Sequence, residues 1–322
     1  MKEEIFDIIG HMPQYAELKG LKKNQKLTHA YMLMSHDSLL LSEFAKLFAK
    51  LVMCEGSSAP CDKCVSCQKN NLGSHPDLCI LPKEDKYSVS TVEWLSHNSN
   101  LVPLEGANKV YILDKFDTAG TAVQNKLLKL LETPLPSVTF ILCVSNERTV
   151  LPTIHSRCKR IRLNQLSEGD IKKYLNKTVP NAKDIDTISK FCGGNLQRAI
   201  DFISVGYMQN YNLVLDTLSS LKSSGTMLLL SSKLNEKKEQ IENIIEIFET
   251  VLREVILLRL NKKELMQSRD ARIEEIAKMI TAPMADLIIR RLYLIKRQLS
   301  LNCSPTGVID NLLLYILEVE HT

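Results

Sequence analysis

The sequence predicts an α/β fold with a parallel sheet in its first half. Residues 109–113 and 140–144 are apolar, β-branched and aromatic runs of strand length. Between them, apolar residues from 122 to 131 recur at helical spacing; Thr118 is placed to cap this helix and Pro134 to end it. Strand, crossover helix and strand in this order predict a parallel βαβ unit. Because ligands gather at the carboxyl ends of parallel strands, we expect any chemistry just beyond these two runs.

Length and composition limit the possible classes of protein. A chain of 322 residues exceeds the size of a single core, so two or three domains are expected. The balance of 41 basic against 37 acidic residues neither requires nor excludes nucleic-acid binding. No apolar run has the length of a membrane span, and the first residues lack the charged and apolar regions of a signal peptide. We therefore expect a cytoplasmic protein that does not associate with membranes.

The chain before residue 109 adds further elements to the predicted sheet. A helical lead over residues 1–29 precedes a buried strand at 30–34 and an amphipathic helix that runs from about 41 to 52. A short apolar run at 78–81 predicts another strand, and a helix is expected around 90–101.

The strand, short turn and helix at 30–52 have the order found around a phosphate-binding loop. Such a loop needs glycines, whose backbone N–H groups close around phosphate oxygens, and a lysine that supplies a positive charge. This turn has no glycine, and leucine stands where the lysine belongs. One serine fits a magnesium-binding hydroxyl, but a serine on an exposed helix face explains it better. The degenerate positions, where we expect no ATP to bind, are Ser35, Ser38, Leu40, Leu41 and Ser42.

Four cysteines form the sharpest local signal in the chain. Cys54, Cys61, Cys64 and Cys67 follow the spacing Cys-x6-Cys-x2-Cys-x2-Cys, which allows four thiolates to converge on one tetrahedral zinc ion. Four thiolates fill the coordination of zinc, so the site should be structural. Unrelated buried or redox thiols are the alternative, and His75 is expected to be a loop histidine rather than a fifth ligand. The remaining cysteines, Cys79, Cys143, Cys158, Cys192 and Cys303, are expected to be small core residues.

After residue 163 the composition becomes helical. Ser167 and Asp170 resemble a capping box, Gly193 and Gly194 end a helix, and a further helix is expected from Asn195. Three amphipathic stripes follow, which we interpret as core; their residues are Ile241, Ile244, Ile245, Phe248, Val251, Leu252, Val255, then Leu287, Ile288, Leu292, Ile295, Leu299, then Ile309, Leu312, Leu313 and Ile316. The serine-rich stretch at 219–232 is expected to be a loop or linker.

The motifs occur in a characteristic order along the chain. They are His29-Ala30-Tyr31, the four cysteines, His75-Pro76-Asp77, residues 109–114, Asn125 to Pro134 and Leu151 to Cys158. In this order they resemble the clamp-loader subunits of bacterial DNA polymerase III, which belong to the AAA+ family. The resemblance rests on motifs within about the first 200 residues and on helical pattern alone beyond them.

The resemblance implies an architecture and a set of partners. It implies an AAA+ domain with a RecA-like parallel sheet over residues 1–163, with a zinc module inserted at 54–67. A small three-helix lid over 164–207 and an all-α collar over 208–322 would follow. Such subunits form a hetero-pentamer that opens the sliding clamp and places it on primed DNA during replication, as part of a DNA-directed DNA polymerase.

The chain departs from the ATP-hydrolysing members of that family. After Asp114 an active site would have an acid to orient water, but this chain has Lys115, a cation unsuited to that role. Asp114 is then a strand-end carboxylate rather than a magnesium ligand. The family's second nucleotide-sensing arginine would fall where Gln197 stands. With the phosphate turn also degraded, we expect a stator subunit without ATPase activity of its own.

The motif Ser156-Arg157-Cys158 is retained. In the family its arginine is a finger offered in trans to a neighbouring ATP site, where a planar, permanently charged guanidinium suits a transferring phosphoryl group. The alternative is a surface arginine that caps a helix end. Two other functions stay open: an active clamp-loader ATPase of the same fold, and a zinc-stabilised scaffold that binds nucleic acid.

Overall fold

The computed structural model describes residues 2–83, 86–133, 137–180, 185–204, 206–221, 223–266, 270–301 and 304–320. The chain separates into two compact units, residues 1–181 with 193–198, and the remainder. The sequence interpretations of Pro134 and Cys303 fall outside the described residues. The finer division into lid and collar stays a prediction.

The first unit is built on a five-stranded parallel sheet. Its strands are β1 (Ala30–Met34), β2 (Leu78–Leu81), β3 (Lys109–Leu113), β4 (Val138–Val144) and β5 (Lys159–Arg162), in the order β2-β3-β4-β1-β5. The predicted parallel βαβ unit is confirmed by the pairing of β3 with β4. We did not predict β5, because its four residues are mostly basic and only Ile161 is buried. Its pairing with the buried β1 holds it in the sheet.

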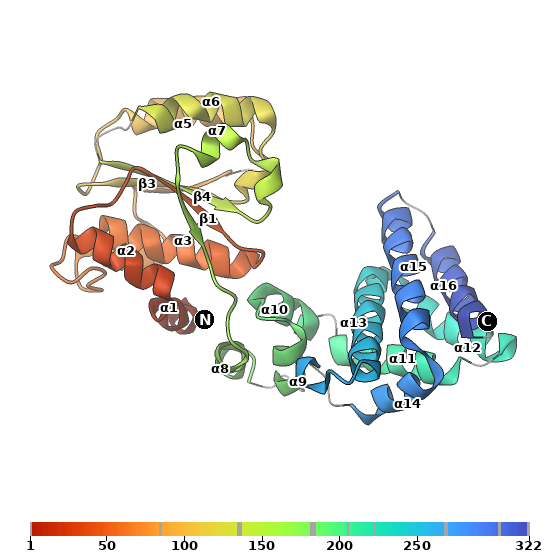
Figure 1. Cartoon of the computed structure of the whole chain (residues 1–322). Helices are drawn as coiled ribbons and strands as arrows, with labels where there is room; N and C mark the ends of the chain where they lie inside the picture. The colour runs from red at the N-terminus through yellow and green to blue at the C-terminus, as the bar shows by residue number, and fades with distance from the viewer. Residues whose placement is uncertain are drawn as a thin grey trace. The chain divides into compact units, whose positions relative to one another are not determined.

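Helices cover both faces of the sheet (Figure 1). On one face lie α2 (Pro13–Lys23) and α3 (Ser38–Met53); on the other lie α5 (Val89–Ser99) and α6 (Thr121–Glu132). Residues Tyr31 and Phe48 meet edge to face between β1 and α3, with ring centroids 4.7 Å apart. The other elements of this unit are α1 (Lys2–Gly10), α4 (Val65–Leu72), α7 (Pro152–His155), α8 (Glu168–Thr178), and the 3-10 helices η1 (Phe116–Thr118) and η2 (Glu147–Thr149).

The predicted cap of α6 was wrong. The helix begins at Thr121, and its N-cap residue is Gly120, which offers no side chain. Thr118 instead closes the short helix η1, where its hydroxyl donates to the carbonyl of Lys115 at 2.8 Å. A β-strand therefore passes into a 3-10 turn before the crossover helix starts, and this turn uses the threonine.

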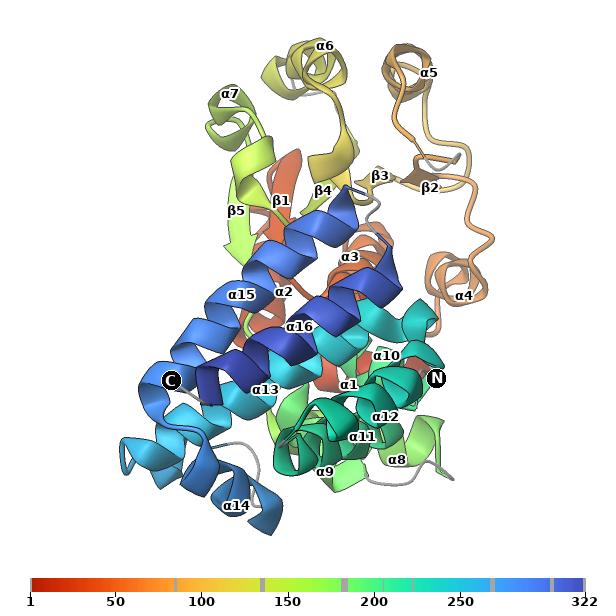
Figure 2. The same ribbon diagram turned by 90° about the vertical axis from the view of Figure 1, so that its right-hand side faces the viewer.

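The second unit is helical in all its described parts. It contains α9 (Ile185–Phe191), most of α10 (Leu196–Ser204), α11 (Tyr207–Ser220), α12 (Ser224–Asn235), η3 (Lys238–Gln240), α13 (Ile241–Arg259), η4 (Lys263–Leu265), α14 (Ala271–Met279), α15 (Ala282–Ser300) and α16 (Pro305–Glu320). Helix α13 packs against α11, α14 and α15, and α16 packs on α15 and α12. Figure 2 shows α13, α15 and α16 running side by side. The first and third predicted stripes are fully buried.

Two expectations for this unit were wrong. Leu287 is 45% exposed, because the buried face of α15 runs through Ala285, Ile288 and Ile289 instead. The serine-rich stretch is not a loop, since it holds the end of α11 and most of α12. Ser223 caps α12 in a capping box with Thr226, so serine here starts a helix rather than interrupting one. Within the described ranges, none of the helices is both long and apolar enough to cross a bilayer.

Candidate functional site

The turn at the N-terminus of α3 lies at the carboxyl end of β1. Asp37 is the N-cap residue of α3, and its Oδ1 accepts a hydrogen bond from the Leu40 amide at 3.0 Å. The Ser35 amide donates to the Val144 carbonyl at 3.2 Å, which ties the turn to the end of β4. The turn therefore has the position that a phosphate-binding loop takes in an α/β sheet.

The side chains at the loop's key positions belong to the core. Leu40 is 0% exposed and Leu41, at the position of the lysine, is 3% exposed. Ser42 is half-buried on α3, and Ser35 is half-buried before it. A lysine at position 41 would place its ammonium group among apolar side chains rather than over the turn. The turn therefore lacks a phosphate site for two reasons: the donors are missing, and the side chains at these positions are packed in the core.

Asp37 makes contacts that we did not predict. Its carboxylate also accepts from the backbone amides of Leu196 and Gln197, the latter at 3.3 Å, at the start of α10. Burial raises the pKa of the Asp37 carboxyl, and the backbone N–H donors partly offset this effect. The position of Asp37 just before a helix could have identified it as a cap. Its link to residues about 160 positions later has no local signal in the sequence.

A cleft of about 840 Å³ opens beside the turn. Its lining comes from the carboxyl ends of β1, β4 and β5 and from residues 194–195; it includes His36, Asp37, Asn146, Arg148, Arg162 and Asn195. Asp117, in the 3-10 helix η1 that follows β3, binds the loop after β4. Its carboxylate accepts from the Ser145 hydroxyl at 2.6 Å and from the Asn146 amide at 3.3 Å.

Asp114 and Lys115 sit at the end of β3. The Asp114 amide donates to the Leu81 carbonyl at 2.8 Å, and its own carbonyl accepts from the Tyr87 hydroxyl at 2.6 Å. Lys115 is exposed and has a left-handed backbone, with φ at +47°. These contacts describe a strand end that passes into a tight turn.

Arg157 lies on the rim of the same unit, between α7 and β5. Its guanidinium donates through Nη1 to the Thr153 carbonyl at 2.8 Å and through Nη2 to Glu132 Oε1 at 2.6 Å. The arginine side chain is 32% exposed, so it is neither sealed in the core nor free in solvent. Ser156 is exposed and its hydroxyl lies 3.3 Å from Nη1. Glu132, at the last turn of α6, is a partner that sequence reasoning missed.

Cys158 is the buried member of that motif. It is 9% exposed, and burial raises the pKa of its thiol to about 12. At neutral pH it is a protonated thiol in the core, which anchors the segment that carries Arg157. Cys143 and Cys192 are buried as well, and Cys79 is half-buried, as expected.

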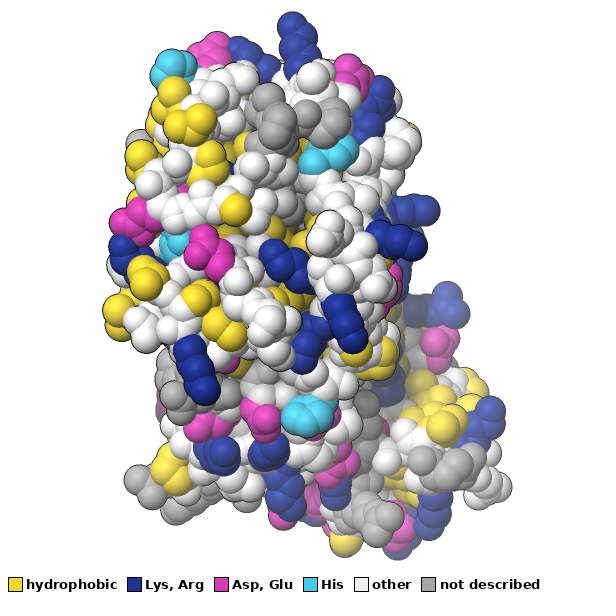
Figure 3. Space-filling model, turned by 90° about the vertical axis from the view of Figure 1, so that its left-hand side faces the viewer, with side chains coloured by type: hydrophobic (Ala, Val, Ile, Leu, Met, Phe, Trp, Pro, Cys, Tyr) yellow, Lys and Arg dark blue, Asp and Glu magenta, His cyan; other side chains and the backbone are white. Residues whose placement is uncertain are grey.

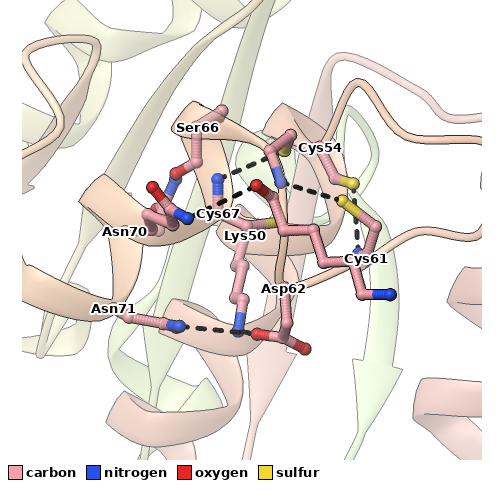
Figure 4. Close-up of polar contacts among 11 residues, drawn as sticks. Lys50, Cys54, Cys61, Asp62, Ser66, Cys67, Asn70 and Asn71 are labelled. Carbon is pink, nitrogen blue, oxygen red and sulfur yellow. Dashed lines mark hydrogen bonds and ion pairs between the residues drawn. The ribbon is translucent and has the colours of Figure 1, made fainter.

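The four predicted metal ligands come together at the C-terminus of α3. Their Sγ atoms all lie within 4.8 Å of one another. Cys54 is the C-cap residue of α3, and Cys64 is the N-cap residue of α4. Figure 4 shows Cys54, Cys61 and Cys67 facing one another below the start of α4. The sequence prediction of one four-thiol cluster is therefore met in geometry.

Backbone amides point at three of the sulfur atoms. Cys54 Sγ accepts from the amides of Gly56 at 3.4 Å and Cys61 at 3.3 Å. Cys61 Sγ accepts from the Cys64 amide at 3.3 Å, and Cys64 Sγ from the Cys67 amide at 3.4 Å. A Cβ on Gly56 would meet Cys61 Sγ at 2.7 Å, so glycine is required beside the thiols. Donors aimed at sulfur stabilise thiolates, the form in which cysteine binds a metal.

The acidities of the four thiols differ. Backbone N–H donors, first that of Lys63, lower the pKa of Cys61 to about 6. Burial raises the pKa of Cys67 to about 12 and also raises that of Cys54. For Cys64, burial acts to raise the pKa, but amides of Glu55 and Cys67 outweigh it and the pKa is lowered. Cys61 thus favours the thiolate on its own, and the chemistry of the set suits a thiophilic ion such as zinc.

His75 supports the cluster from outside. Its Nε2 lies 3.1 Å from the Ser66 hydroxyl, which donates to the Met53 carbonyl at 3.0 Å. Its Nδ1 accepts from the Asp77 amide at 3.1 Å, and burial lowers the pKa of the ring. The neutral ring therefore donates from Nε2 to serine and joins α4 to the loop before β2. The expectation that His75 is a loop residue rather than a ligand agrees with this geometry.

An ion pair closes the other side of the cluster. Lys50 is 5% exposed on the last turns of α3, and its ammonium group contacts the Asp62 carboxylate (Figure 4). Asn71 donates to the same carboxylate at 3.4 Å. The cluster is therefore fastened to the helix end on two sides.

The charged side chains near the four-cysteine cluster, and on one face of the molecule (Figure 3), are mixed in sign. On the face drawn in Figure 3, Lys and Arg side chains stand among acidic and uncharged ones instead of forming one continuous basic stripe. Near the cluster, Lys69 is paired with Glu105 and Lys50 with Asp62. Paired lysines attract phosphate less strongly than free ones.

The parallel sheet, with a turn and helix directly after β1, defines the class of α/β nucleotide-binding folds. Residues 10–167 match the family described as DNA polymerase III, delta subunit. The chain is 30% identical over 156 residues to the delta' subunit of DNA polymerase III from Bacillus subtilis, covering 48% of this chain and 47% of that protein. It is 27% identical over 216 residues to the gamma subunit from Buchnera aphidicola subsp. Schizaphis graminum, covering 65% of this chain and 58% of that one.

The chain thus spans about half the length of these two relatives. Over its whole length it also resembles a gamma subunit-related protein of DNA polymerase III from Thermotoga maritima, at a TM-score of 0.43 and 16% identity, with 94% of this chain and 99% of that chain covered. Over residues 10–167, just under half of the chain, the sequence is thus similar to subunits of DNA polymerase III.

Proposed function

We propose that the chain is a delta-prime type stator subunit of the DNA polymerase III clamp loader, without ATPase activity of its own. The observation that carries this proposal is the turn at 35–42. Leu40 and Leu41 are buried where a phosphate loop needs glycine and lysine, and the carboxylate of Asp37 takes the amides at the helix N-terminus. A nucleotide phosphate would find the Leu40 amide already bonded to Asp37 and no lysine in the turn.

In this proposal the chain contributes to catalysis in a neighbouring subunit. Arg157 would enter the neighbour's ATP site and stabilise charge on the transferring phosphoryl group. Its exposure of 32% on the rim supports this role, since a core arginine could not reach another chain. The partners are the other subunits of a hetero-pentamer, the sliding clamp and primed DNA, in the cytoplasm.

The four-cysteine cluster completes the proposal as a structural zinc site. Cys54, Cys61, Cys64 and Cys67 would hold the ion and leave no open position for water. When bound, zinc supplies a crosslink between the end of α3 and the start of α4. The contacts of His75 with Ser66 and of Lys50 with Asp62 support the same two helix ends.

An active ATPase of the gamma type is the second candidate, because the gamma subunit of Buchnera is among the relatives. The affinity of the isolated chain for ATP distinguishes the stator from the active ATPase. The isolated chain is titrated with a fluorescent ATP analogue and Mg²⁺, and we expect no saturable binding up to millimolar concentration. Saturable binding at micromolar concentration would favour the ATPase and contradict the stator.

The finger is tested in the assembled complex. Arg157→Ala should lower the ATP hydrolysis rate at the adjoining site about 10³-fold. The total ATP turnover of the complex with clamp and primed DNA should fall by the part that this site contributes. Arg160→Ala is the matched control, since Arg160 is exposed three positions further along. Equal turnover in the wild-type and Arg157→Ala complexes would remove the trans role.

A further inference from the structure

We propose that Asp37 is an internal anion that fills the phosphate position of the degenerate turn and fastens residues 193–198 to it. The inference deepens the proposed function and rests on its premise that the turn holds no nucleotide. It adds that the Asp37 carboxylate occupies the phosphate position. It also adds that this carboxylate docks the segment that begins α10 onto the turn.

The geometry places one carboxylate between two helix N-termini. Asp37 Oδ1 accepts from the Leu40 amide of α3 at 3.0 Å and from the Gln197 amide of α10 at 3.3 Å. Oδ2 accepts from the Leu196 amide of α10. The side chain is only 4% exposed, so these amides replace the water that would otherwise solvate it.

The electrostatics of that position are those of a phosphate site. The first amides of a helix have no partner within the helix and carry its partial positive charge. Two such ends converge on Asp37, and all the donors given above are backbone N–H groups. An anion is therefore the favoured occupant, and the chain supplies it from its own side chain.

An ordinary helix cap does not account for these contacts. Ser167 caps α8, and the bonds between it and Asp170 stay within four residues of chain. Asp37 instead bridges two segments about 160 positions apart. The second segment is also shaped to fit: Gly194 has φ at +78°, its carbonyl accepts from the Leu166 amide at 3.1 Å, and an added Cβ would meet the Leu166 carbonyl oxygen at 2.8 Å.

The neighbouring bonds reinforce the same docking. Asn195 donates from its side chain to the His36 carbonyl at 3.2 Å, and its Oδ1 accepts from the Arg198 amide at 2.9 Å. Residues 193–198 are thus held on the turn by a carboxylate in the centre and by an amide beside it. All of these bonds join groups of the chain itself, so in this proposal the docking of the segment requires no ATP.

Amide hydrogen exchange on the full chain tests the inference. In Asp37→Ala we expect exchange at Leu40, Leu196 and Gln197 to rise together, each by about tenfold or more, because each amide loses its acceptor. Asp37→Asn, which keeps one acceptor oxygen, should give a smaller rise at the same three amides. Ser167→Ala is the control, and its effect should stay within residues 168–170.

Inorganic phosphate supplies the second arm of the test. Phosphate should slow exchange at Leu196 and Gln197 in Asp37→Ala relative to chloride at equal ionic strength, and leave the wild-type chain unchanged. The inference is overturned if the Leu196 and Gln197 amides stay protected in both Asp37 variants, or if phosphate protects wild type and variant equally. ATP binding by the wild-type chain would defeat the proposed function, whereas these exchange rates report on Asp37 alone.

Discussion

Helix α3 has one candidate site at each end, and the two sites differ in where along the chain their residues come from. At the C-terminal end, four cysteines from one short stretch present their sulfur atoms to a common point. At the N-terminal end, Asp37 occupies the turn and its partners come from a distant part of the chain. In our proposals, one end holds a set of ligands for an external ion, and the other holds a side chain where an external anion would bind.

The difference teaches that a degenerate site is not an empty one. Four thiols without their metal remain close together and can still bind a metal ion. A phosphate turn with leucines in its core positions and a carboxylate on its amides has no position open to an external phosphate while that carboxylate is in place. Removal of metal should thus affect the cysteine end of α3, whereas addition of a nucleotide should not affect the Asp37 end.

Removal of metal is expected to have the largest effect. Chelation, or Cys64→Ser, should unfold residues 54–72 locally and lower the stability of the first unit by several kcal/mol, because structural zinc binding is folding free energy. Metal content, limited proteolysis and urea unfolding measure this. Cys79→Ser is the control, since Cys79 lies outside the cluster. A metal-free chain with unchanged proteolysis in this segment would show that the thiols need no ion.

The second largest effect on stability is expected when the missing lysine of the turn is restored, and this change should not restore ATP binding. Leu41→Lys restores the missing lysine, yet Leu41 is 3% exposed, so the change should cost about 3 kcal/mol of unfolding free energy and create no ATP site. Urea unfolding and nucleotide titration measure the two parts. Ser38→Lys, at an exposed position, is the matched control. If Leu41→Lys bound ATP at unchanged stability, the distinction between the two ends of α3 would be lost.

The smallest effect is expected at Ser42, the residue that fits a magnesium-binding hydroxyl. Ser42→Ala should change stability by less than about 0.5 kcal/mol, because the side chain is half-buried on a regular helix. It should leave clamp loading by the complex unchanged. Calorimetry and loading assays measure this. A loss of Mg²⁺-dependent loading in this variant would show that the turn still serves nucleotide chemistry.

The sequence contained more of the fold than of the site. Strands β1, β2 and β3 were predicted with their observed bounds, because short runs that are mostly apolar mark strands whether they are buried, as β1 and β3 are, or lie at the edge, as β2 does. Strand β5 escaped because its stability comes from pairing with β1, which a run of basic residues does not reveal. The serine-rich start of α12 was misread because serine both breaks and caps helices.

For the site, local spacing decided what could be predicted. The four cysteines lie within 14 residues of chain, so their convergence follows from the turns between them. The contacts of Asp37 with Leu196, and of Arg157 with Glu132, join residues 159 and 25 positions apart. Such contacts depend on how the sheet brings its loops together, at the carboxyl ends of the strands for Asp37 and before β4 and β5 for Arg157. A single sequence states these residues but not their partners.

The pair of Arg157 and Glu132 has a consequence for assembly. In the trans role proposed for Arg157, a phosphate group that approaches this arginine would meet a guanidinium already paired with a carboxylate 2.6 Å away. Engagement in trans is then an exchange of one anion for another, with Glu132 released to water, and not the capture of an anion by a free cation. Added salt weakens the pair that is broken as well as the pair that is made, so ionic strength should affect this step less than it affects contact with an unpaired arginine.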